Sequence, residues 1–280
     1  METAMTIKAA EIMTQRLVSA QAEIHVLDAI ERLIAHRVSG IPILDRSGHL
    51  EGRFSERNAI AAMDLADISP ASGCAGQFQR FTAARIAQGH PVLQSDMDVF
   101  QAVDFLLKGR ISGAPVVGVD GAFLGVFSEQ SAMHVFIGMC WEQMPSACVT
   151  AWISHEPERC ISSVTTLDEI MDRFHRTAFR RLMVIRDGKL AGQVSRREAL
   201  HAALECTRTS VVVSRDEAFR DGVASSARVG HWMQTDVPSV GIDDSVVSVA
   251  QTFVSTGARQ LPVLNAGQMV GQISRSDLLR

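Results

Sequence analysis

The sequence predicts an α+β fold made of four repeats, each with the element order β-α-β-β-α. Three observations support this prediction. A Gly-x-x-Ser motif recurs at wide intervals, an apolar run and a glycine-containing turn precede each copy, and a segment of helical periodicity precedes each apolar run. The motif copies begin at Gly52, Gly125, Gly192 and Gly271. A unit of ~55 residues buries only about 60% of its surface by itself, so the units should pack against one another.

Repeat one gives the clearest example of the unit. Apolar residues at helical spacing predict its first helix, and a second helix is expected to begin after Ser55. The two strands between these helices flank a turn at Gly48, where glycine permits positive φ. The expected elements are a strand at 17–19, a helix at 25–37, strands at 41–44 and 50–54, and a helix at 56–65.

Repeats two and three copy this layout. In repeat two we expect a strand near 91–93, a helix at 97–108, strands at 114–117 and 123–127, and a helix at 129–137. In repeat three we expect a helix at 166–176, strands at 182–185 and 190–194, and a helix at 196–204. Repeat three departs from the pattern at Leu182, where we place the proline of the other three apolar runs.

Repeat four has a shorter turn at 265–267 and ends almost as soon as its last helix begins. Sequential elements usually lie next to each other in space, so repeat one should pair with two and repeat three with four. The connector before repeat four includes 211–213, an apolar run compatible with a strand. The predicted repeats are 5–66, 81–140, 145–206 and 227–280, the linkers are 66–80 and 207–227, and the predicted domains are 5–140 and 145–280.

The charge distribution argues against a nucleic-acid partner. The net charge of −4 comes from the first half of the chain, because acidic and basic residues balance in the second half. The basic residues of the second half are nearly all arginine, and they form no stripe of the kind that duplex nucleic acid requires. The chain has no apolar run of the ~18 residues that a membrane span needs. It also lacks a signal peptide, so we expect a cytoplasmic protein.

The reactive residue types form no recognisable catalytic or metal site. Five cysteines include no C-x-x-C pair, which fits reduced and mostly buried thiols. The nine histidines show no paired metal-ligand spacing, and no P-loop, dinucleotide-binding or nucleophile-elbow motif occurs. The sequence therefore predicts a protein that is not an enzyme and needs no metal or cofactor.

The repeated motif has two interpretations. Ser-x-x-Glu at a helix start is a capping box, which Ser195 with Glu198 matches and Ser274 with Asp277 nearly matches. The same strand-to-helix junction presents free backbone N–H groups and a partial positive charge to a phosphate. A carboxylate one turn further on has acceptors for both hydroxyls of a ribose.

The four copies together resemble the CBS domain, a family named for cystathionine β-synthase. Its pattern, -P-V-h-D-x-x-G-x-h-h-G-h-h-(S/T)-x-x-D, is similar to the segment from Ile41 through Gly48 to Asn58 and to the three equivalent segments. The resemblance implies pairs of repeats that form Bateman modules, bind adenosine-containing ligands in clefts between repeats and signal to a partner. Four repeats in one chain are most similar to the gamma subunit of AMP-activated protein kinase, whose two modules form a flat disk.

The resemblance also implies site residues. The family's ribose-binding aspartate falls on Asp277, and the equivalent positions hold Asn58, Ser131 and Glu198. The hydroxyl position falls on Ser55, Ser128, Ser195 and Ser274, with Ser276 beside the aspartate. The phosphate-binding basic residue lies two positions before the strand proline or one further back. In the first module, the position two before the proline holds Gly40 and Gly113. In the second module it holds Arg180 in repeat three and Gln260 in repeat four, where Arg259 stands one residue further back.

The ribose-binding carboxylate and the phosphate-binding arginines both favour the second module. The clefts of the first module are expected to be empty or to suit an uncharged ligand. The resulting candidates for ligand binding are Ser274, Arg275, Ser276, Asp277, Arg259, Ser195, Arg196, Glu198 and Arg180.

The leading hypothesis is a non-catalytic sensor that binds AMP, ADP or ATP and signals to a separate effector protein or through a homodimer. One alternative is a structural scaffold with vestigial clefts, as Asn58 and Ser131 suggest. Another is an S-adenosylmethionine-binding protein that uses the ribose contact without the arginines.

Overall fold

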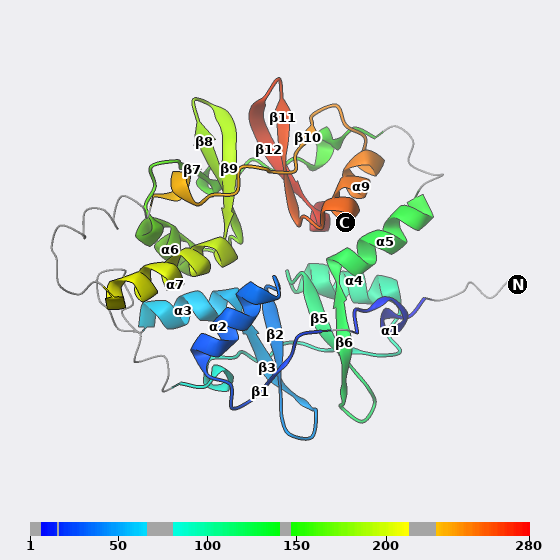
Figure 1. Cartoon of the computed structure of the whole chain (residues 1–280). Coiled ribbons are helices and arrows are strands. Elements are labelled where there is room, and N and C mark those ends of the chain that lie inside the picture. Colours follow the sequence, from blue (N-terminus) through cyan, green and yellow to red (C-terminus); the bar gives the residue numbers. More distant parts are fainter. Residues whose placement is uncertain (1–6, 16, 66–80, 141–146, 213–227) are drawn as a thin grey trace, which may run out of the picture.

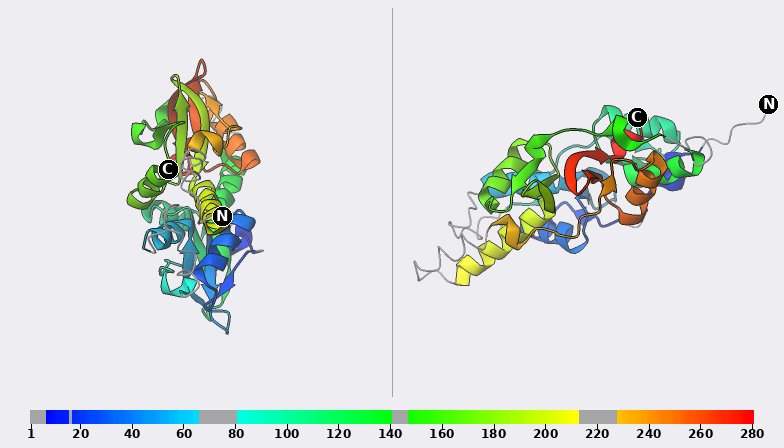
Figure 2. Two further views of the ribbon diagram at one scale, coloured as in Figure 1. Left: turned by 60° about the vertical axis from the view of Figure 1, so that its left-hand side comes forward. Right: turned by 90° about the horizontal axis from the view of Figure 1, so that it is seen from above.

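The computed structural model describes residues 7–15, 17–65, 81–140, 147–212 and 228–280. Four repeats with the predicted β-α-β-β-α order surround a common centre (Figure 1). Turned by 60° or 90°, the molecule is much thinner than in the first view, so the repeats form a flattened body (Figure 2). Among the described residues, none of the helices combines the length and hydrophobicity that crossing a membrane requires.

The elements of the first half follow the expected order. Repeat one contains β1 (Ala20–Gln21), α2 (Val26–Ala35), β2 (Gly40–Leu44), β3 (Leu50–Ser55) and α3 (Glu56–Leu65). Repeat two contains β4 (Leu93–Gln94), α4 (Val99–Lys108), β5 (Gly113–Val117), β6 (Phe123–Ser128) and α5 (Glu129–Cys140). The short helices α1 (Ala9–Ile12) and η2 (Ala83–Arg85) precede repeats one and two.

The elements of the second half repeat this order. Repeat three contains β7 (Cys160–Ser162), α6 (Leu167–Arg176), β8 (Arg181–Arg186), β9 (Lys189–Ser195) and α7 (Arg196–Val212). Repeat four contains β10 (Val240–Gly241), α9 (Val246–Thr256), β11 (Gln260–Asn265), β12 (Gln268–Ser274) and α10 (Arg275–Leu278). Three short helices accompany them: η3 (Val149–Trp152), η4 (Pro157–Arg159) and η5 (Val229–His231).

Several predicted boundaries are wrong by a few residues. The first strand lies at Ala20–Gln21 instead of 17–19. The side chain of Asp98 accepts the N–H groups of Phe100 and Gln101, so α4 begins two residues later than predicted. The apolar residues at 211 and 212 belong to α7, which contradicts the predicted strand at 211–213 and moves the start of the connector beyond 207. The first linker, 66–80, lies outside the described residues.

Each repeat builds the same small sheet. The short first strand runs parallel to the first strand of the hairpin, and the two hairpin strands are antiparallel. The predicted turn glycines have positive φ, from 75° at Gly188 to 85° at Gly48, which confirms their role. The sheets of repeats three and four join into one six-stranded sheet through the pairing of Gln268 with Lys189.

Each motif glycine lies where the backbone of another repeat passes. A Cβ atom added at Gly125 would lie 2.8 Å from the carbonyl oxygen of Thr14, and one added at Gly271 would lie 2.9 Å from that of Ser154. Gly52 and Gly192 face Gln88 and Gln234 in the same way. Main-chain bridges accompany these contacts: Thr14 with Val126, Arg53 with Gln88, Ser154 with Gln272, and Gln193 with Gln234. The motif therefore needs glycine because repeats one and two, and repeats three and four, exchange their leading segments.

The hydrophobic cores connect the repeats in a different combination. One core contains Phe54 of repeat one and Phe174 of repeat three, and α3 packs against α6 and α7. A second core contains Met133 of repeat two and Phe253 of repeat four, where α5 packs against α9 and α10. Sequence reasoning missed these helical contacts between repeats one and three and between two and four. The division into domains 5–140 and 145–280 stays a prediction, which the segment exchange supports.

The three described cysteines correct one expectation. Cys148 is exposed, and Cys160 and Cys206 are half-buried, so none of these thiols is buried as predicted. All three are free of disulfide bonds. In the described part of the chain, no three His, Cys, Asp or Glu side chains gather in an arrangement that could hold a metal ion.

Candidate functional site

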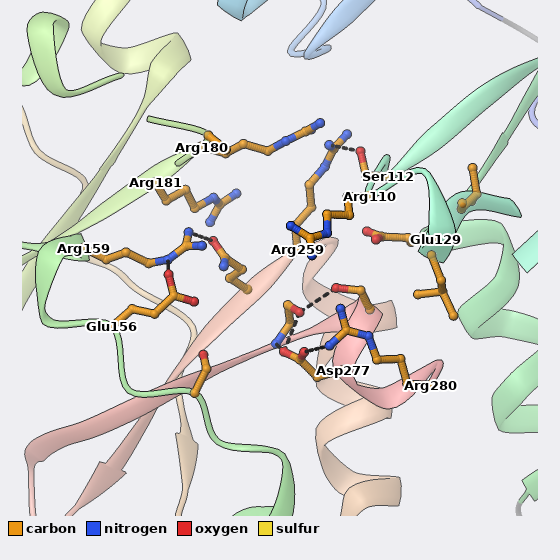
Figure 3. Close-up of a pocket in the computed structure, with 17 residues that line it drawn as sticks. Arg110, Ser112, Glu129, Glu156, Arg159, Arg180, Arg181, Arg259, Asp277 and Arg280 are labelled. Carbon is orange, nitrogen blue, oxygen red and sulfur yellow. Dashed lines mark hydrogen bonds and ion pairs between the residues drawn. The ribbon is translucent and has the colours of Figure 1, made fainter. Parts of the chain in front are cut away.

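A cavity of about 470 Å³ opens where repeats two, three and four meet (Figure 3). Its wall is strongly cationic, because six arginines and only three carboxylates line it. The arginines are Arg110, Arg159, Arg180, Arg181, Arg259 and Arg280. The carboxylates are Glu129, Glu156 and Asp277, and the polar residues Ser112, Ser154, Gln260, Ser274 and Ser276 complete the polar lining.

The sheet register corrects the alignment of repeat three. Met183 pairs with Gln193 as Pro262 pairs with Gln272, so Met183 occupies the proline position and the assignment of Leu182 to it is wrong by one residue. Arg181 therefore occupies the position of Gln260.

The corrected register makes Arg180 and Arg259 equivalent. The carbonyl of Arg180 accepts the N–H of Arg196, and the carbonyl of Arg259 accepts the N–H of Arg275. The carbonyls of Ser39 and Ser112 accept the corresponding N–H groups in repeats one and two. The first half thus has serine where the second half has the two arginines.

The side chain of Arg259 connects the two halves of the chain. Its Nη1 donates to Ser112 Oγ at 2.7 Å and its Nη2 donates to Ser39 Oγ at 3.0 Å. The Arg180 guanidinium extends toward that of Arg259 in Figure 3. Within the described residues, no hydrogen bond or salt bridge engages the Arg180 side chain, so its donors are available to an anion.

Two further arginines of the cavity, Arg159 and Arg181, have partners. Arg181 donates to Gln193 Oε1 at 3.1 Å. Arg159 pairs with Glu156 at 2.5 Å and lies over the ring of Phe179, 4.2 Å from its centroid. These contacts fix the orientation of both guanidinium groups.

Burial governs the electrostatics of this centre. It lowers the pKa of Arg180 and of Arg259 to about 10, because a guanidinium loses hydration there. The charge of Arg53 lowers the pKa of Arg180 further, and the charge of Arg180 lowers that of Arg259. Arg53 of repeat one belongs to the same centre, and burial and the charge of Arg259 lower its pKa to about 10. Burial raises the pKa of the Glu129 carboxyl, although Arg259 and Arg180 oppose that shift. A bound anion would relieve the repulsion between these cations.

Asp277 both caps a helix and faces the cavity. Its Oδ2 accepts the backbone N–H of Ser274 at 2.8 Å and the Ser274 hydroxyl at 2.6 Å, which confirms the capping interpretation. Its Oδ1 lies 3.6 Å from Nη1 of Arg280. Ser276 Oγ shares a hydrogen bond of 2.8 Å with Ser274 Oγ. Capping therefore occupies Oδ2, whereas Oδ1 pairs with Arg280.

Only five of the nine candidate residues line this cavity: Ser274, Ser276, Asp277, Arg259 and Arg180. The other four lie outside the cavity lining. Glu198 accepts the backbone N–H of Ser195 at 2.7 Å. Arg196 donates to the carbonyls of Phe174 and Thr177, and the Arg275 side chain is 4% exposed. The structure does not bring these four residues to the cavity.

The first half uses the equivalent positions for internal contacts. Asn58 Oδ1 accepts the N–H of Ser55 at 3.0 Å, and Asn58 Nδ2 donates to the carbonyl of Ile86 at 3.0 Å. Ser131 and Ser128 share a hydrogen bond of 3.2 Å between their hydroxyls. These side chains hold repeats one and two in place and present no carboxylate.

Sequence reasoning missed four of the cationic residues in the cavity: Arg110, Arg159, Arg181 and Arg280. A correct register would have found Arg181, because it stands one residue before the apolar run. Arg110 has positive φ (49°), as does the equivalent Arg37 (53°), in the turn between the first helix of its repeat and the hairpin. No local signal indicates Arg159 or Arg280, since only the tertiary fold brings them to the site.

The chain belongs to the CBS domain family. The family matches it four times, at residues 9–65, 85–138, 153–205 and 229–280. These segments correspond to the four repeats, and the predicted resemblance is confirmed.

Two solved structures share the complete architecture. Protein MJ1225 from Methanocaldococcus jannaschii, described as a candidate archaeal homologue of g-AMPK, aligns with a TM-score of 0.80 and 15% identity over 98% of this chain and 99% of that chain. An uncharacterized conserved protein from Pyrococcus horikoshii aligns with a TM-score of 0.58 and 17% identity over 98% of both chains. These similarities establish the fold.

Proposed function

We propose that this chain is a non-catalytic regulatory protein that binds an adenine nucleotide, AMP, ADP or ATP, in the cavity between repeats two, three and four. One observation carries the proposal: the cavity collects six arginines against three carboxylates, and four of these arginines are partly buried. Burying like charges is costly unless an opposite charge accompanies them, and a phosphate chain supplies that charge.

The phosphate contacts are assigned to Arg180 and Arg259. Both residues are partly buried, they lie at equivalent positions, and the Arg180 side chain extends toward the Arg259 guanidinium (Figure 3). Guanidinium groups bind phosphate oxygens with geometric specificity because they donate in a planar fork. Arg180 has free donors, whereas Arg259 must share its donors with Ser39 and Ser112 or release them.

The ribose contact is assigned to Asp277. A carboxylate oxygen accepts hydrogen bonds from sugar hydroxyls, and Asp277 lines the cavity with its Oδ1 at 3.6 Å from Arg280 Nη1. Ser276 stands beside it and offers a further hydroxyl to the sugar. The sugar would lie at the rim and the phosphates at the centre, so the two recognition elements lie in the order that a nucleotide requires.

The output of this protein is assigned to a separate protein or to a second copy of the chain. Arg259 links the cavity to repeats one and two, so a ligand that draws its guanidinium away from Ser39 and Ser112 would change how the halves pack. A ligand shifts such an equilibrium only through a difference in affinity for the two arrangements, and couplings of about 1–3 kcal/mol are typical.

A specific observation favours a second candidate, the structural scaffold. The Asp277 carboxylate already accepts two hydrogen bonds from Ser274, as an ordinary helix cap does. An unliganded scaffold would use Asp277 in this way alone. The S-adenosylmethionine hypothesis predicts no use of the buried arginines, and it therefore leaves the cationic lining unexplained.

Titration calorimetry of the whole chain with AMP, ADP, ATP, NADH and S-adenosylmethionine distinguishes these functions. The proposal expects an adenine nucleotide to bind, with affinity lost when Arg180 and Arg259 are replaced by alanine. Binding of S-adenosylmethionine that survives both replacements would establish the alternative ligand. A ligand at 100 times its Kd raises the free energy of unfolding by roughly 2.7 kcal/mol. If no compound binds and none produces this increase at high concentration, the scaffold hypothesis is correct.

A further inference from the structure

The residue after the motif serine has opposite charge in the two halves of the chain. It is Glu56 in repeat one and Glu129 in repeat two, but Arg196 in repeat three and Arg275 in repeat four. Each of these residues begins the second helix of its repeat. Each also donates its N–H to the carbonyl that precedes the hairpin, so the four positions are structurally equivalent.

The helix dipole does not favour the two arginines. A helix N-terminus carries a partial positive charge and favours acidic side chains, which suits Glu56 and Glu129 and disfavours Arg196 and Arg275. The arginines are also buried, with exposures of 5% and 4%. A buried guanidinium at this end of a helix needs compensation from another part of the molecule.

Arg196 donates to the carbonyls of Phe174 and Thr177, and both arginines begin helices that pack on the other half of the chain. Repeat one packs on repeat three through α3 and α7, which begin with Glu56 and Arg196. Repeat two packs on repeat four through α5 and α10, which begin with Glu129 and Arg275. Each contact therefore joins a helix that begins with a glutamate to a helix that begins with an arginine.

The electrostatics agree with this arrangement. Burial raises the pKa of the Glu56 carboxyl, and the charges of Arg197, Arg259, Arg180 and Arg196 oppose that shift. Burial lowers the pKa of Arg275 to about 10, and the charge of Glu129 opposes that shift.

We infer that the two halves of the chain are complementary interaction surfaces, in which the acidic helix starts of repeats one and two select the basic helix starts of repeats three and four. Pairing of like halves, within one chain or between two copies, would bury Glu against Glu or Arg against Arg. Opposite charges thereby determine that a first half pairs with a second half. The apolar cores contribute to both contacts in addition. This inference concerns the folded chain without ligand and is independent of nucleotide binding.

Charge exchange in the full-length chain tests the inference by thermal unfolding. Glu56→Arg with Glu129→Arg makes all four helix starts basic, and Arg196→Glu with Arg275→Glu makes all four acidic. Each double variant is expected to lower Tm by about 5–10 °C or more, and the quadruple exchange should recover most of the loss. Glu51→Arg, on an exposed position of β3, is the matched control and should leave Tm nearly unchanged.

The sign of one variant separates this inference from a local effect. The helix dipole alone predicts that Arg275→Glu raises Tm, whereas complementary pairing predicts that it lowers Tm. The inference is overturned if Arg275→Glu is stabilising, or if the quadruple exchange is no more stable than the worse double variant. If the charge-reversed chains fail to fold, a double-mutant cycle of the neutral variants Glu129→Gln and Arg275→Gln decides. Losses in the free energy of unfolding that simply add would show that these charges do not interact.

Discussion

The two halves of this protein share one fold and differ at the positions that face the centre. Repeats three and four place Arg180 and Arg259 where repeats one and two have Ser39 and Ser112. Asp277 stands where repeat one has Asn58. The cavity described above draws its residues from repeats two, three and four, with most of its charge from the second half. A few substitutions at fixed positions of one repeat therefore distinguish a candidate binding half from a structural half.

Replacing Arg180 and Arg259 should have the largest effect on the difference in binding between the two halves. The double variant Arg180→Ala, Arg259→Ala removes two charged donors to phosphate. Each hydrogen bond to a charged group contributes about 1.5–3 kcal/mol, so nucleotide affinity should fall more than a hundredfold in titration calorimetry. The exposed arginines of the pairs Arg46–Glu23 and Arg176–Asp172 provide a matched double alanine control. An unchanged affinity in the first variant would remove these residues from the site.

The motif glycines allow a comparison of stability with binding. Gly125→Ala and Gly271→Ala each place a Cβ within 3 Å of a backbone carbonyl oxygen, so both should lower the free energy of unfolding by about 1–3 kcal/mol in denaturant titration. Only Gly271→Ala displaces Ser154, a residue of the cavity wall, and only it should also weaken nucleotide binding. Equal effects of both changes on binding would contradict the assignment of the ligand to the second half.

Asn58→Asp tests whether the first half can regain a site by one substitution. The variant restores the carboxylate of the family pattern but replaces the amide that donates to the Ile86 carbonyl. An oxygen would then face an oxygen, at a cost of about 1–3 kcal/mol in the free energy of unfolding. We expect chemical denaturation to show this loss and calorimetry to show no second nucleotide site. A second site of similar affinity would mean that the halves differ less than described.

Asp277→Asn isolates the ribose contact. The amide oxygen keeps the cap on Ser274, so the helix start should be preserved, while the charge offered to the sugar hydroxyls is lost. We expect about a tenfold lower nucleotide affinity, since that ratio corresponds to about 1.4 kcal/mol, with little change in Tm. A large fall in Tm with unchanged affinity would show that Asp277 acts only as a cap.

Glu129→Gln should have the smallest effect and a defined pH dependence. Burial raises the pKa of Glu129, and the carboxyl is charged, and repels phosphate, only above that raised pKa. The variant should therefore bind nucleotide about threefold more tightly than the wild type at pH 8. The difference should shrink as the pH falls through the raised pKa, because the wild-type carboxyl becomes neutral there. Glu51→Gln, at an exposed position, is the control.

The sequence predicted the repeated fold because its signals are local. The glycines of the hairpin turns, the helical periodicity and the junction serines each depend on a few neighbouring residues, and the structure has these elements within a few residues of the expected positions. The misplacement of Leu182 arose because repeat three lacks the proline that marks the register in the other repeats. Without that marker, only strand pairing shows that Arg181 and not Arg180 precedes the apolar run in the position of Gln260.

The candidate site was predictable only in part. Asp277, Ser274, Ser276, Arg180 and Arg259 lie in family positions and do line the cavity. The equivalent residues of repeat three, Ser195 and Glu198, are joined by a backbone hydrogen bond and do not line it. Sequence reasoning could not separate these two junctions, because the difference arises from long-range packing: Arg259 reaches Ser39 and Ser112 across 220 and 147 residues of chain.

A crystal structure of the full chain grown with ATP tests the central claim most directly. We predict that the phosphates contact Arg180 and Arg259, that the ribose hydroxyls contact Asp277 Oδ1, and that no nucleotide lies between repeats one and two. A nucleotide bound instead beside Asn58 and Ser131 would contradict the account. So would crystals grown at saturating ATP in which the arginine-lined cavity contains no ligand.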